Sequence, residues 1–302
     1  MTSHVTIYLP AAALALFASL LSAQNATSPE YGPPKGTLLI VGGGRMDGTG
    51  IMETFINRAG GPGAKIMVVP TAAGNKDRNG NWIVYKEADI IAPWLKLGAT
   101  NVHMFHTHDP KEADTEEFAR TVRDAKGVWF NGGRQWNCVD SYMNTLTYRE
   151  FHNVLARGGV IGGSSAGATI QGDYLVRGAI AGPDIMMTPE PEHERGFKFL
   201  RRSGIDQHIN TRNRWDDLQP VMKKYPELVG IGLSEGTAIL VNEDRFEVMG
   251  KWKVAIWDNT HPREPWEKPF FVLSAGDVYN MKTRSVEKYG IGNQTPVSIQ
   301  AH

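Results

Sequence analysis

Short, continuous apolar runs alternate with longer amphipathic stretches over the first part of the chain. The apolar runs are typical of strands buried on both faces, and they span 37–41, 65–70, 102–105, 127–131 and 159–162. Between them, residues 83–97, 115–125 and 148–156 have helical character. Strands that alternate with helices predict an α/β fold, with a mostly parallel sheet covered by helices on both faces. Nothing between residues 36 and 178 indicates a second domain.

The spacing of the apolar runs changes in the last third of the chain. Three short runs, at 237–241, 245–249 and 253–257, follow one another closely, as the strands of a meander do. We expect all three to extend the same sheet as antiparallel strands.

One N-terminal segment, from Val5 to Ala23, is apolar enough to meet a membrane. Its apolar centre ends at a small-residue cleavage site, Ser22-Ala23, and polar residues follow. We therefore expect residues 1–23 to be a signal peptide, 24–35 a linker and 36–302 one domain, with the mature protein secreted or periplasmic. An uncleaved anchor helix is the alternative, because the run is close to spanning length.

Charge and cysteine content exclude several classes of partner and of covalent bond. The 302 residues include 32 Lys+Arg and 32 Asp+Glu, so the formal net charge is zero. This balance argues against a nucleic-acid partner, and against a stable membrane partner once the leader is removed. Cys138 is the one cysteine, which rules out an internal disulfide.

A candidate nucleophile follows the fifth apolar run. Residues 163–167 read Gly-Ser-Ser-Ala-Gly and fit the G-x-S-x-G elbow, a strained strand-to-helix turn that lifts the Ser165 hydroxyl above the sheet. The preceding run also ends in a Gly-Gly turn, so the amides of Gly133 and Ala166 are candidate oxyanion donors. The alternative is a glycine-rich turn that only packs closely or that binds a phosphate at a helix N-terminus.

A serine hydroxyl needs a base to take its proton, and His208 lies in the densest polar cluster after Ser165. Arg212 and Arg214 follow it and suit a substrate carboxylate. A surface histidine in a solvated loop is equally consistent with this pattern. The two arginines could instead be structural partners of nearby carboxylates such as Asp217.

Taken together, these motifs resemble a known family. The phrases that carry the resemblance are Ile-Val-Gly-Gly-Gly at 40–44, Phe-Asn-Gly-Gly-Arg-Gln at 130–135, Gly-Gly-Ser-Ser-Ala-Gly-Ala at 162–168, Asp-Gln-His at 206–208 and Gly-Ile-Gly-Leu-Ser-Glu-Gly-Thr-Ala at 230–238. They resemble the cyanophycinase and dipeptidase E family of serine peptidases, and its cyanophycinase branch more closely. The resemblance implies a flavodoxin-like fold of the class I glutamine amidotransferase kind, with Ser165 as nucleophile and His208 as base. It also implies substrate contacts, which we assign to Gln135, Asp206, Gln207, Arg212 and Arg214.

Two points stay open within this resemblance. For the acid of the triad we prefer Glu235, which begins an apolar strand, and Asp173 or Asp184 on the loop after the elbow are the alternatives. In the family, three arginines after the histidine hold the β-aspartyl-arginine repeat of the polymer cyanophycin. The third of these positions is Asp217 here, so cyanophycin itself is in doubt and Asp217 could receive a basic group of a peptide.

The sequence therefore predicts a secreted serine peptidase that hydrolyses aspartate-containing peptide or isopeptide bonds. We expect no cofactor, and a homodimer is left open. One alternative is a metal-dependent hydrolase that uses His103, His106 and His108, which form the one cluster with zinc-ligand spacing. The other is a catalytically silent relative that binds peptides.

Overall fold

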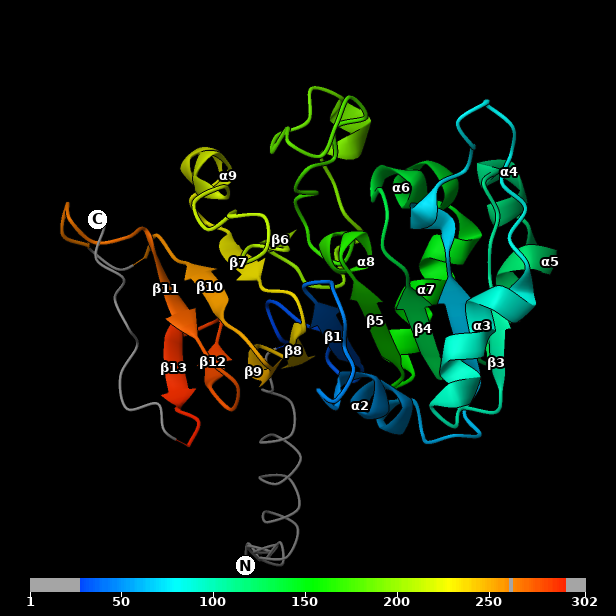
Figure 1. The fold of residues 1–302 in the computed structure, drawn as a ribbon, viewed down its shortest axis with the longest axis horizontal. Coiled ribbons are helices and arrows are strands. Elements are labelled where there is room, and N and C mark those ends of the chain that lie inside the picture. Colours follow the sequence, from blue (N-terminus) through cyan, green and yellow to red (C-terminus); the bar gives the residue numbers. More distant parts are fainter. Residues whose placement is uncertain (1–27, 261–262, 292–302) are drawn as a thin grey trace, which may run out of the picture.

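The computed structural model describes residues 28–260 and 263–291, and its largest element is a nine-stranded sheet (Figure 1). The strand order is β13-β12-β9-β8-β1-β5-β4-β2-β3. Five neighbouring strands run parallel: β1 (Thr37–Val41), β5 (Val160–Ser164), β4 (Gly127–Phe130), β2 (Ile66–Val69) and β3 (Val102–Met104). These are the five apolar runs, so the prediction of a mostly parallel α/β sheet is confirmed.

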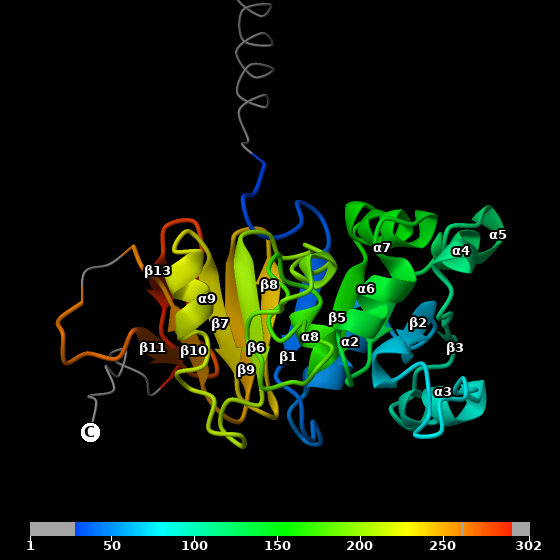
Figure 2. The same ribbon diagram turned by 90° about the horizontal axis from the view of Figure 1, so that it is seen from above.

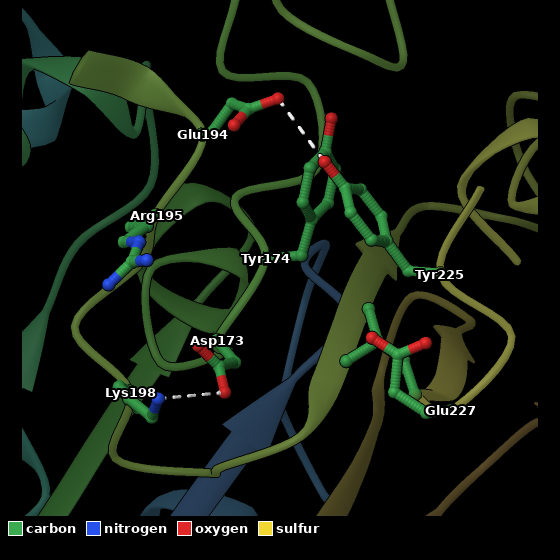
Figure 3. Close-up of a pocket in the computed structure, with 8 residues that line it drawn as sticks. Asp173, Tyr174, Glu194, Arg195, Lys198, Tyr225 and Glu227 are labelled. Carbon is green, nitrogen blue, oxygen red and sulfur yellow. Dashed lines mark hydrogen bonds and ion pairs between the residues drawn. The ribbon is translucent and has the colours of Figure 1, made fainter. Parts of the chain in front are cut away.

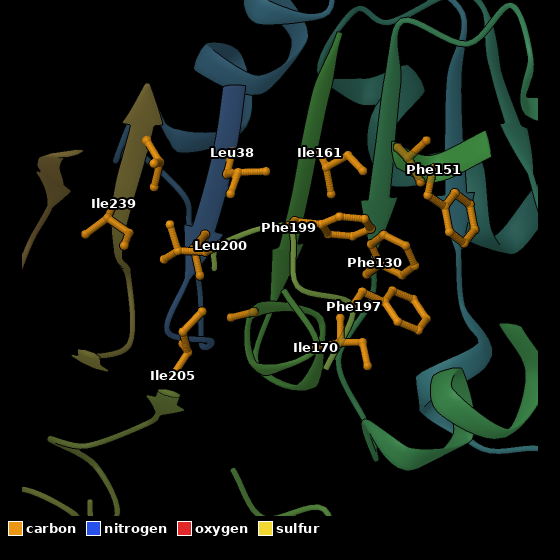
Figure 4. Packing of buried hydrophobic residues seen from close by; sticks show 14 of the residues in the cluster. Leu38, Phe130, Phe151, Ile161, Ile170, Phe197, Phe199, Leu200, Ile205 and Ile239 are labelled. Atoms are coloured by element: carbon orange, nitrogen blue, oxygen red, sulfur yellow. The ribbon is translucent and has the colours of Figure 1, made fainter. Parts of the chain in front are cut away.

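Helices cover both faces of this sheet (Figure 2). Trp129 of β4 packs against α2 (Ile51–Arg58) and α3 (Glu87–Lys96) through Phe55 and Trp94. The next residue, Phe130, faces the other way and packs against Phe151 of α7 (Leu146–Ala156), because successive side chains of a strand alternate between faces (Figure 4). The remaining helical segments are α4 (Pro110–Ala113), α5 (Glu116–Ala119), α6 (Trp136–Tyr142), α8 (Ala166–Thr169), α9 (Gln219–Lys224), and the 3-10 turns Thr71–Ala73, Arg120–Val122 and Pro191–His193.

The antiparallel extension is confirmed for two of the three predicted strands. β8 (Thr237–Asn242) pairs with β1, and β9 (Arg245–Gly250) pairs with β8, both antiparallel. β12 (Val278–Asn280) and β13 (Ser285–Lys288) then complete the sheet.

The placement of the third predicted strand in the same sheet is wrong. β10 (Val254–Trp257) belongs to a separate four-stranded sheet of order β11-β10-β7-β6. Its partners are β7 (Val229–Leu233) and β11 (Phe270–Leu273), while β6 (Ser203–Gln207) runs parallel to β7. An apolar antiparallel strand has the same pattern in either sheet, so the sequence could not distinguish them.

The two sheets meet at the carboxyl ends of several strands. The backbone N–H of His208, directly after β6, donates to the carbonyl of Gly42, directly after β1. The N–H of Gly236, between β7 and β8, donates to the carbonyl of Gly43. These two bonds bring residues from both sheets to one place, where polar side chains gather.

The N-terminal segments are described only in part. The expected signal peptide lies outside the described residues. From residue 28 on, the expected linker packs on the domain: Tyr31 is buried, and Arg201 donates to the carbonyls of Pro29, Glu30 and Gly32. Within residues 28–260 and 263–291, no helix has the length and apolarity needed to cross a membrane.

Candidate active site

Ser165 lies at the turn between β5 and α8, with φ 58° and ψ −116°. This backbone conformation is strained for a residue with a side chain, and it is the geometry of a nucleophile elbow. The Ser165 N–H donates to the Val41 carbonyl of β1 at 3.0 Å. A Cβ at Gly163 would overlap the Gly167 carbonyl, and a Cβ at Gly167 would overlap the Phe130 carbonyl. Glycine is therefore required on both sides of the serine.

A continuous hydrogen-bonded chain joins the three residues that the sequence selected. The Ser165 hydroxyl lies 2.8 Å from Nε2 of His208, and Nδ1 of His208 lies 2.5 Å from Oε1 of Glu235. The Thr211 hydroxyl donates to the same Glu235 oxygen at 2.9 Å. With Nδ1 donating to the carboxylate, Nε2 is the acceptor for the serine proton, which is the arrangement of a nucleophile, a base and an orienting acid.

The glycines after β1 form the surface on which the histidine and the glutamate rest. Gly43 has φ +102°, and a Cβ there would overlap Cε1 of the His208 ring. At Gly44, with φ +70°, a Cβ would lie 2.6 Å from Oε2 of Glu235. Sequence reasoning did not assign this role to the Gly42–Gly44 turn, although three glycines at a strand end signal a close approach.

Burial and neighbouring charges favour the protonation states that this chemistry needs. Burial lowers the pKa of His208, and the cations Arg212 and Arg214 lower it further, against the opposing hydrogen bond to Glu235. Burial acts to raise the pKa of Glu235, but the hydrogen bonds from His208 and Thr211 outweigh it and the pKa is lowered. Near neutral pH the imidazole is therefore neutral and the carboxylate is ionised.

The two aspartates considered for the acid role have other partners. Asp173 pairs with Lys198 at 3.3 Å and accepts the N–H of Arg202. The Asp184 side chain is 94% exposed and lies 3.6 Å from Nη2 of Arg214. In this structure the carboxylate that contacts the histidine is that of Glu235.

The residues expected to supply the oxyanion donors, Gly133 and Ala166, adjoin the end of β4 and the serine in sequence. A Cβ at Gly132 would lie 3.2 Å from the Ser165 Cβ, which places the end of β4 directly against the nucleophile. Gly133 follows with φ +144°, and Ala166 begins α8. Ala166 thus directly follows the nucleophile, and Gly133 directly follows the glycine that contacts it, so both stay candidate oxyanion donors.

Two of the expected substrate contacts are occupied by internal bonds. Gln135 is 3% exposed, and its side-chain amide donates to the carbonyls of Val176 and Arg177, both at 2.7 Å. Asp206 is fully buried, and both of its carboxylate oxygens accept bonds from Arg177. In this structure, the bonds of both side chains run to the segment that holds Val176 and Arg177.

The other three expected contacts have polar groups without a partner or lie at the surface. Gln207 and Arg214 are buried, and Oε1 of Gln207 and Nη1 of Arg214 have no hydrogen-bond partner among the described residues. Arg212 is exposed. Two positively charged side chains, Arg212 and Arg214, therefore lie near enough to His208 to act on its charge.

The three histidines of the proposed metal site have separate contacts. His103 bonds to Asn101, His106 bonds to the Thr71 hydroxyl at 2.8 Å, and His108 stacks on Trp82. In the part of the chain that the structure describes, no group of three His, Cys, Asp or Glu side chains could hold a metal ion. The metal-dependent alternative is therefore not favoured.

A cavity of about 250 Å³ lies away from these residues (Figure 3). Its lining is Asp173, Tyr174, Glu194, Arg195, Lys198, Tyr225, Glu227 and Leu228. Tyr174 bonds to Ser203, the first residue of β6, whereas His208 follows the last. The cavity therefore lies at the opposite end of β6 from the serine and is not the reaction site.

Comparison with known proteins shows the family of the chain. Residues 38–249 match the model of peptidase family S51. The chain belongs to peptidase family S51. Relatives of this S51 chain include the cyanophycinases of Synechococcus elongatus (26% identical, 86% of this chain and 84% of the relative) and Trichormus variabilis (27%, 87% and 92%). The expected membership of the cyanophycinase and dipeptidase E family is thus confirmed.

Solved structures support the fold of this S51 chain. A peptidase from an acI-B1 actinobacterium is 24% identical with a TM-score of 0.60, covering 83% of this chain and 98% of that one. A putative peptidase E protein from Listeria monocytogenes is 14% identical with a TM-score of 0.51, covering 72% and 100%. At these identities the likeness concerns the fold alone.

Proposed function

We propose that this protein is an exported serine-type peptidase that hydrolyses aspartate-containing peptide or isopeptide bonds. The observation that carries the proposal is the hydrogen-bonded chain from Ser165 through His208 to Glu235. Membership of a peptidase family supports the hydrolase chemistry. Intact nucleophile and base argue against a catalytically silent relative.

The geometry supports acyl transfer in two stages. As the Ser165 oxygen attacks the carbonyl carbon, its proton passes to Nε2 of His208, and Glu235 stabilises the imidazolium through Nδ1. The amides of Gly133 and Ala166 would stabilise the oxyanion. His208 then gives the proton to the leaving amine, which departs and leaves an acyl-enzyme. The same imidazole then takes a proton from water, which attacks the acyl-enzyme. The acid product leaves, and the proton passes to the Ser165 oxygen to restore the hydroxyl.

Arginine chemistry supports an acidic substrate. Arg214 has an unpartnered Nη1, Arg212 is exposed, and guanidinium groups bind carboxylates through paired hydrogen bonds. The charge of Asp217 is already paired within the protein, because its carboxylate accepts a bond from Nη2 of Arg177 at 2.5 Å. The proposal therefore gives Asp217 no contact with a basic group of the peptide. The names of the cyanophycinase relatives make that polymer a substrate to test.

The nucleophile is tested by replacing Ser165 with Ala. We expect kcat/KM to fall by at least about 10³-fold with an unchanged circular dichroism spectrum, because the acyl-enzyme can no longer form. Wild-type protein should also be labelled at Ser165 by a fluorophosphonate, as intact-protein mass spectrometry and peptide mapping would show. Ser164→Ala, one residue earlier, is the matched control and should keep both activity and labelling. Near-full activity of Ser165→Ala would refute the mechanism.

The substrate class is tested with α- and β-aspartyl dipeptides, matched dipeptides without an acidic residue, and cyanophycin. Mass spectrometry of the products shows which bond is cleaved. We expect cleavage only in the acidic set. Cleavage confined to the non-acidic set would refute the substrate assignment, even with Ser165 as the nucleophile.

Export is supported by the apolar segment and cleavage site of residues 5–23. The test is expression of the full chain and sequencing of the mature N-terminus. A chain that begins after Ala23 in the periplasm or medium supports export, and an intact N-terminus inside the cell contradicts it.

A further inference from the structure

Arg177 is a buried arginine that bonds to two carboxylates behind the active site. It is 2% exposed and has φ 57°, a conformation that costs free energy in a residue with a side chain. Its Nε and Nη2 donate to the two oxygens of Asp206 at 2.8 and 3.0 Å, and Nη2 also donates to Asp217 at 2.5 Å. Nη1 donates to the carbonyl of Pro183 at 2.6 Å. Each of the three guanidinium nitrogens therefore donates within the protein.

These carboxylates lie at the two ends of the loop that carries the base. Asp206 is two residues before His208, and Asp217 is nine residues after it, with Arg212 and Arg214 between them. One guanidinium thus ties both ends of the loop together.

The same two carboxylates act on Arg214. Burial lowers the pKa of Arg214 and the charges of Arg177 and Arg212 lower it further, whereas the charges of Asp206 and Asp217 oppose this shift. Yet Nη1 of Arg214 has no partner among the described residues, and the ion pair recorded for this side chain is a 3.6 Å contact with the exposed Asp184. Removing Arg177 would leave two carboxylates uncompensated beside Arg214. Because an unpaired buried charge is costly, they would draw this guanidinium toward them.

We propose that Arg177 is a positioning residue that occupies Asp206 and Asp217, and so keeps Arg214 free for the carboxylate of the substrate. The inference rests on the proposed function, in which Arg214 meets that carboxylate. It predicts an effect on substrate affinity that depends on the two aspartates and not on Arg177 alone.

The test is a series of variants assayed on the aspartyl dipeptide that the wild type cleaves best. Arg177→Gln should raise KM by at least about tenfold, the equivalent of one captured charged contact, with a smaller change in kcat. Neutralising the carboxylates as well, in Arg177→Gln/Asp206→Asn/Asp217→Asn, should return KM most of the way to the wild-type value. A purely structural role for Arg177 predicts that the triple variant is no better than the single one.

The single variant leaves a buried charge and could fail to fold, so the series includes Arg177→Gln/Asp206→Asn. This double variant lacks the fully buried charge, and adding Asp217→Asn to it should lower KM. If KM does not fall at that step, the inference is wrong. Arg284→Gln is the matched control: Arg284 is also a buried arginine, with its ion pair to Asp258 instead. It should lower the melting temperature and leave KM unchanged.

Fluorophosphonate labelling separates this inference from the proposed function. The reagent needs the serine and the histidine but no substrate carboxylate, so every folded variant should be labelled at the wild-type rate. Failure to label the wild type would overturn the proposed function. Normal labelling with a KM that does not respond to Arg177 would overturn the inference alone.

Discussion

The His208 ring is largely buried and is faced by two arginines, and both effects favour its neutral form. A general base acts only when neutral, so kcat/KM should fall as pH decreases through the pKa of His208. Because this pKa is lowered, we expect the midpoint of the acidic limb to lie below about 6.5, the ordinary value for histidine. The measurement is a profile of kcat/KM against pH for the best aspartyl dipeptide.

The cause of this shift can be tested at the same residue. Arg212→Gln removes a cation that lowers the pKa of His208, so the midpoint should move to higher pH. Lys223→Gln, an exposed cation on α9, is the control and should not move it. An unperturbed acidic limb in Arg212→Gln would show that this charge does not reach the imidazole.

Glu235 and Asp184 can be compared by removing one charge at a time. Glu235→Gln keeps the shape but loses the anion that orients and stabilises the imidazole, so kcat should fall at least about hundredfold. Asp184→Asn should have little effect, because its exposed carboxylate contacts Arg214 and not His208. If Asp184→Asn cripples turnover while Glu235→Gln costs less than about tenfold, the two roles must be exchanged.

At the scale of the element, the turn between β5 and α8 requires a residue without a side chain at Gly167. Gly167→Ala would place a Cβ on the Phe130 carbonyl and push α8 away from β4. We expect the free energy of unfolding to fall by at least about 2 kcal/mol, measured by urea denaturation, because overpacking a rigid turn forces the backbone to move.

Gly182→Ala is the control for the elbow. A Cβ at Gly182 would meet nothing within 4 Å, so the change in stability should stay within about 0.5 kcal/mol. Equal effects at the two glycines would contradict the close approach of α8 to β4.

Most of the strands that the sequence pattern revealed have continuous apolar runs. β6 was missed because it reads Ser-Gly-Ile-Asp-Gln and has no such run. Its polar members are nevertheless buried, since Asp206 finds a partner in Arg177 from a distant segment. A short strand whose burial depends on a specific long-range ion pair leaves no local periodicity to read.

The residues of the site also differ in whether a local sequence pattern could reveal them. Ser165 was found from a local turn motif, and His208 and Glu235 from their polar context and the family phrases. Arg177 was not found, because its partners lie 29 and 40 residues further along the chain and only folding brings them together. Gln135 and Asp206 were assigned to the substrate by resemblance, whereas in the structure their bonds turn inward to the segment that holds Arg177.

Across the whole molecule, the hydrogen-bonded chain crosses between the two sheets. Ser165 follows β5 of the nine-stranded sheet, whereas His208 and Glu235 follow β6 and β7 of the smaller one. A shared core fixes the sheets, because one buried cluster contains Ile205 of β6 together with Leu38 of β1 and Ile161 of β5 (Figure 4). Loosening this core would separate the nucleophile from its base, so global stability and activity are coupled.

Acid should weaken that stability through three buried or half-buried histidines. Burial lowers the pKa of His106 to about 4, and it also lowers the pKa values of His152 and His208. In the unfolded chain these groups titrate near 6.5. Between the two values the unfolded state binds more protons, so the free energy of unfolding should fall steadily as pH decreases from about 6.5 toward 4. Urea denaturation at a series of pH values measures this slope.

His106 allows the source of the slope to be isolated, because it lies on Thr71 and is not part of the Ser165 chain. His106→Gln can still bond to the Thr71 hydroxyl but cannot take up a proton, so the dependence on pH between 6.5 and 4.5 should become shallower. The control is His103→Gln, at an exposed histidine three residues before His106, and it should keep the wild-type slope. Carboxylates with lowered pKa values, such as Glu235, lose their contribution at lower pH still, below about 4.5. A slope unchanged in His106→Gln, or a wild type that gains stability toward pH 4.5, would contradict the burial of a neutral imidazole at this position.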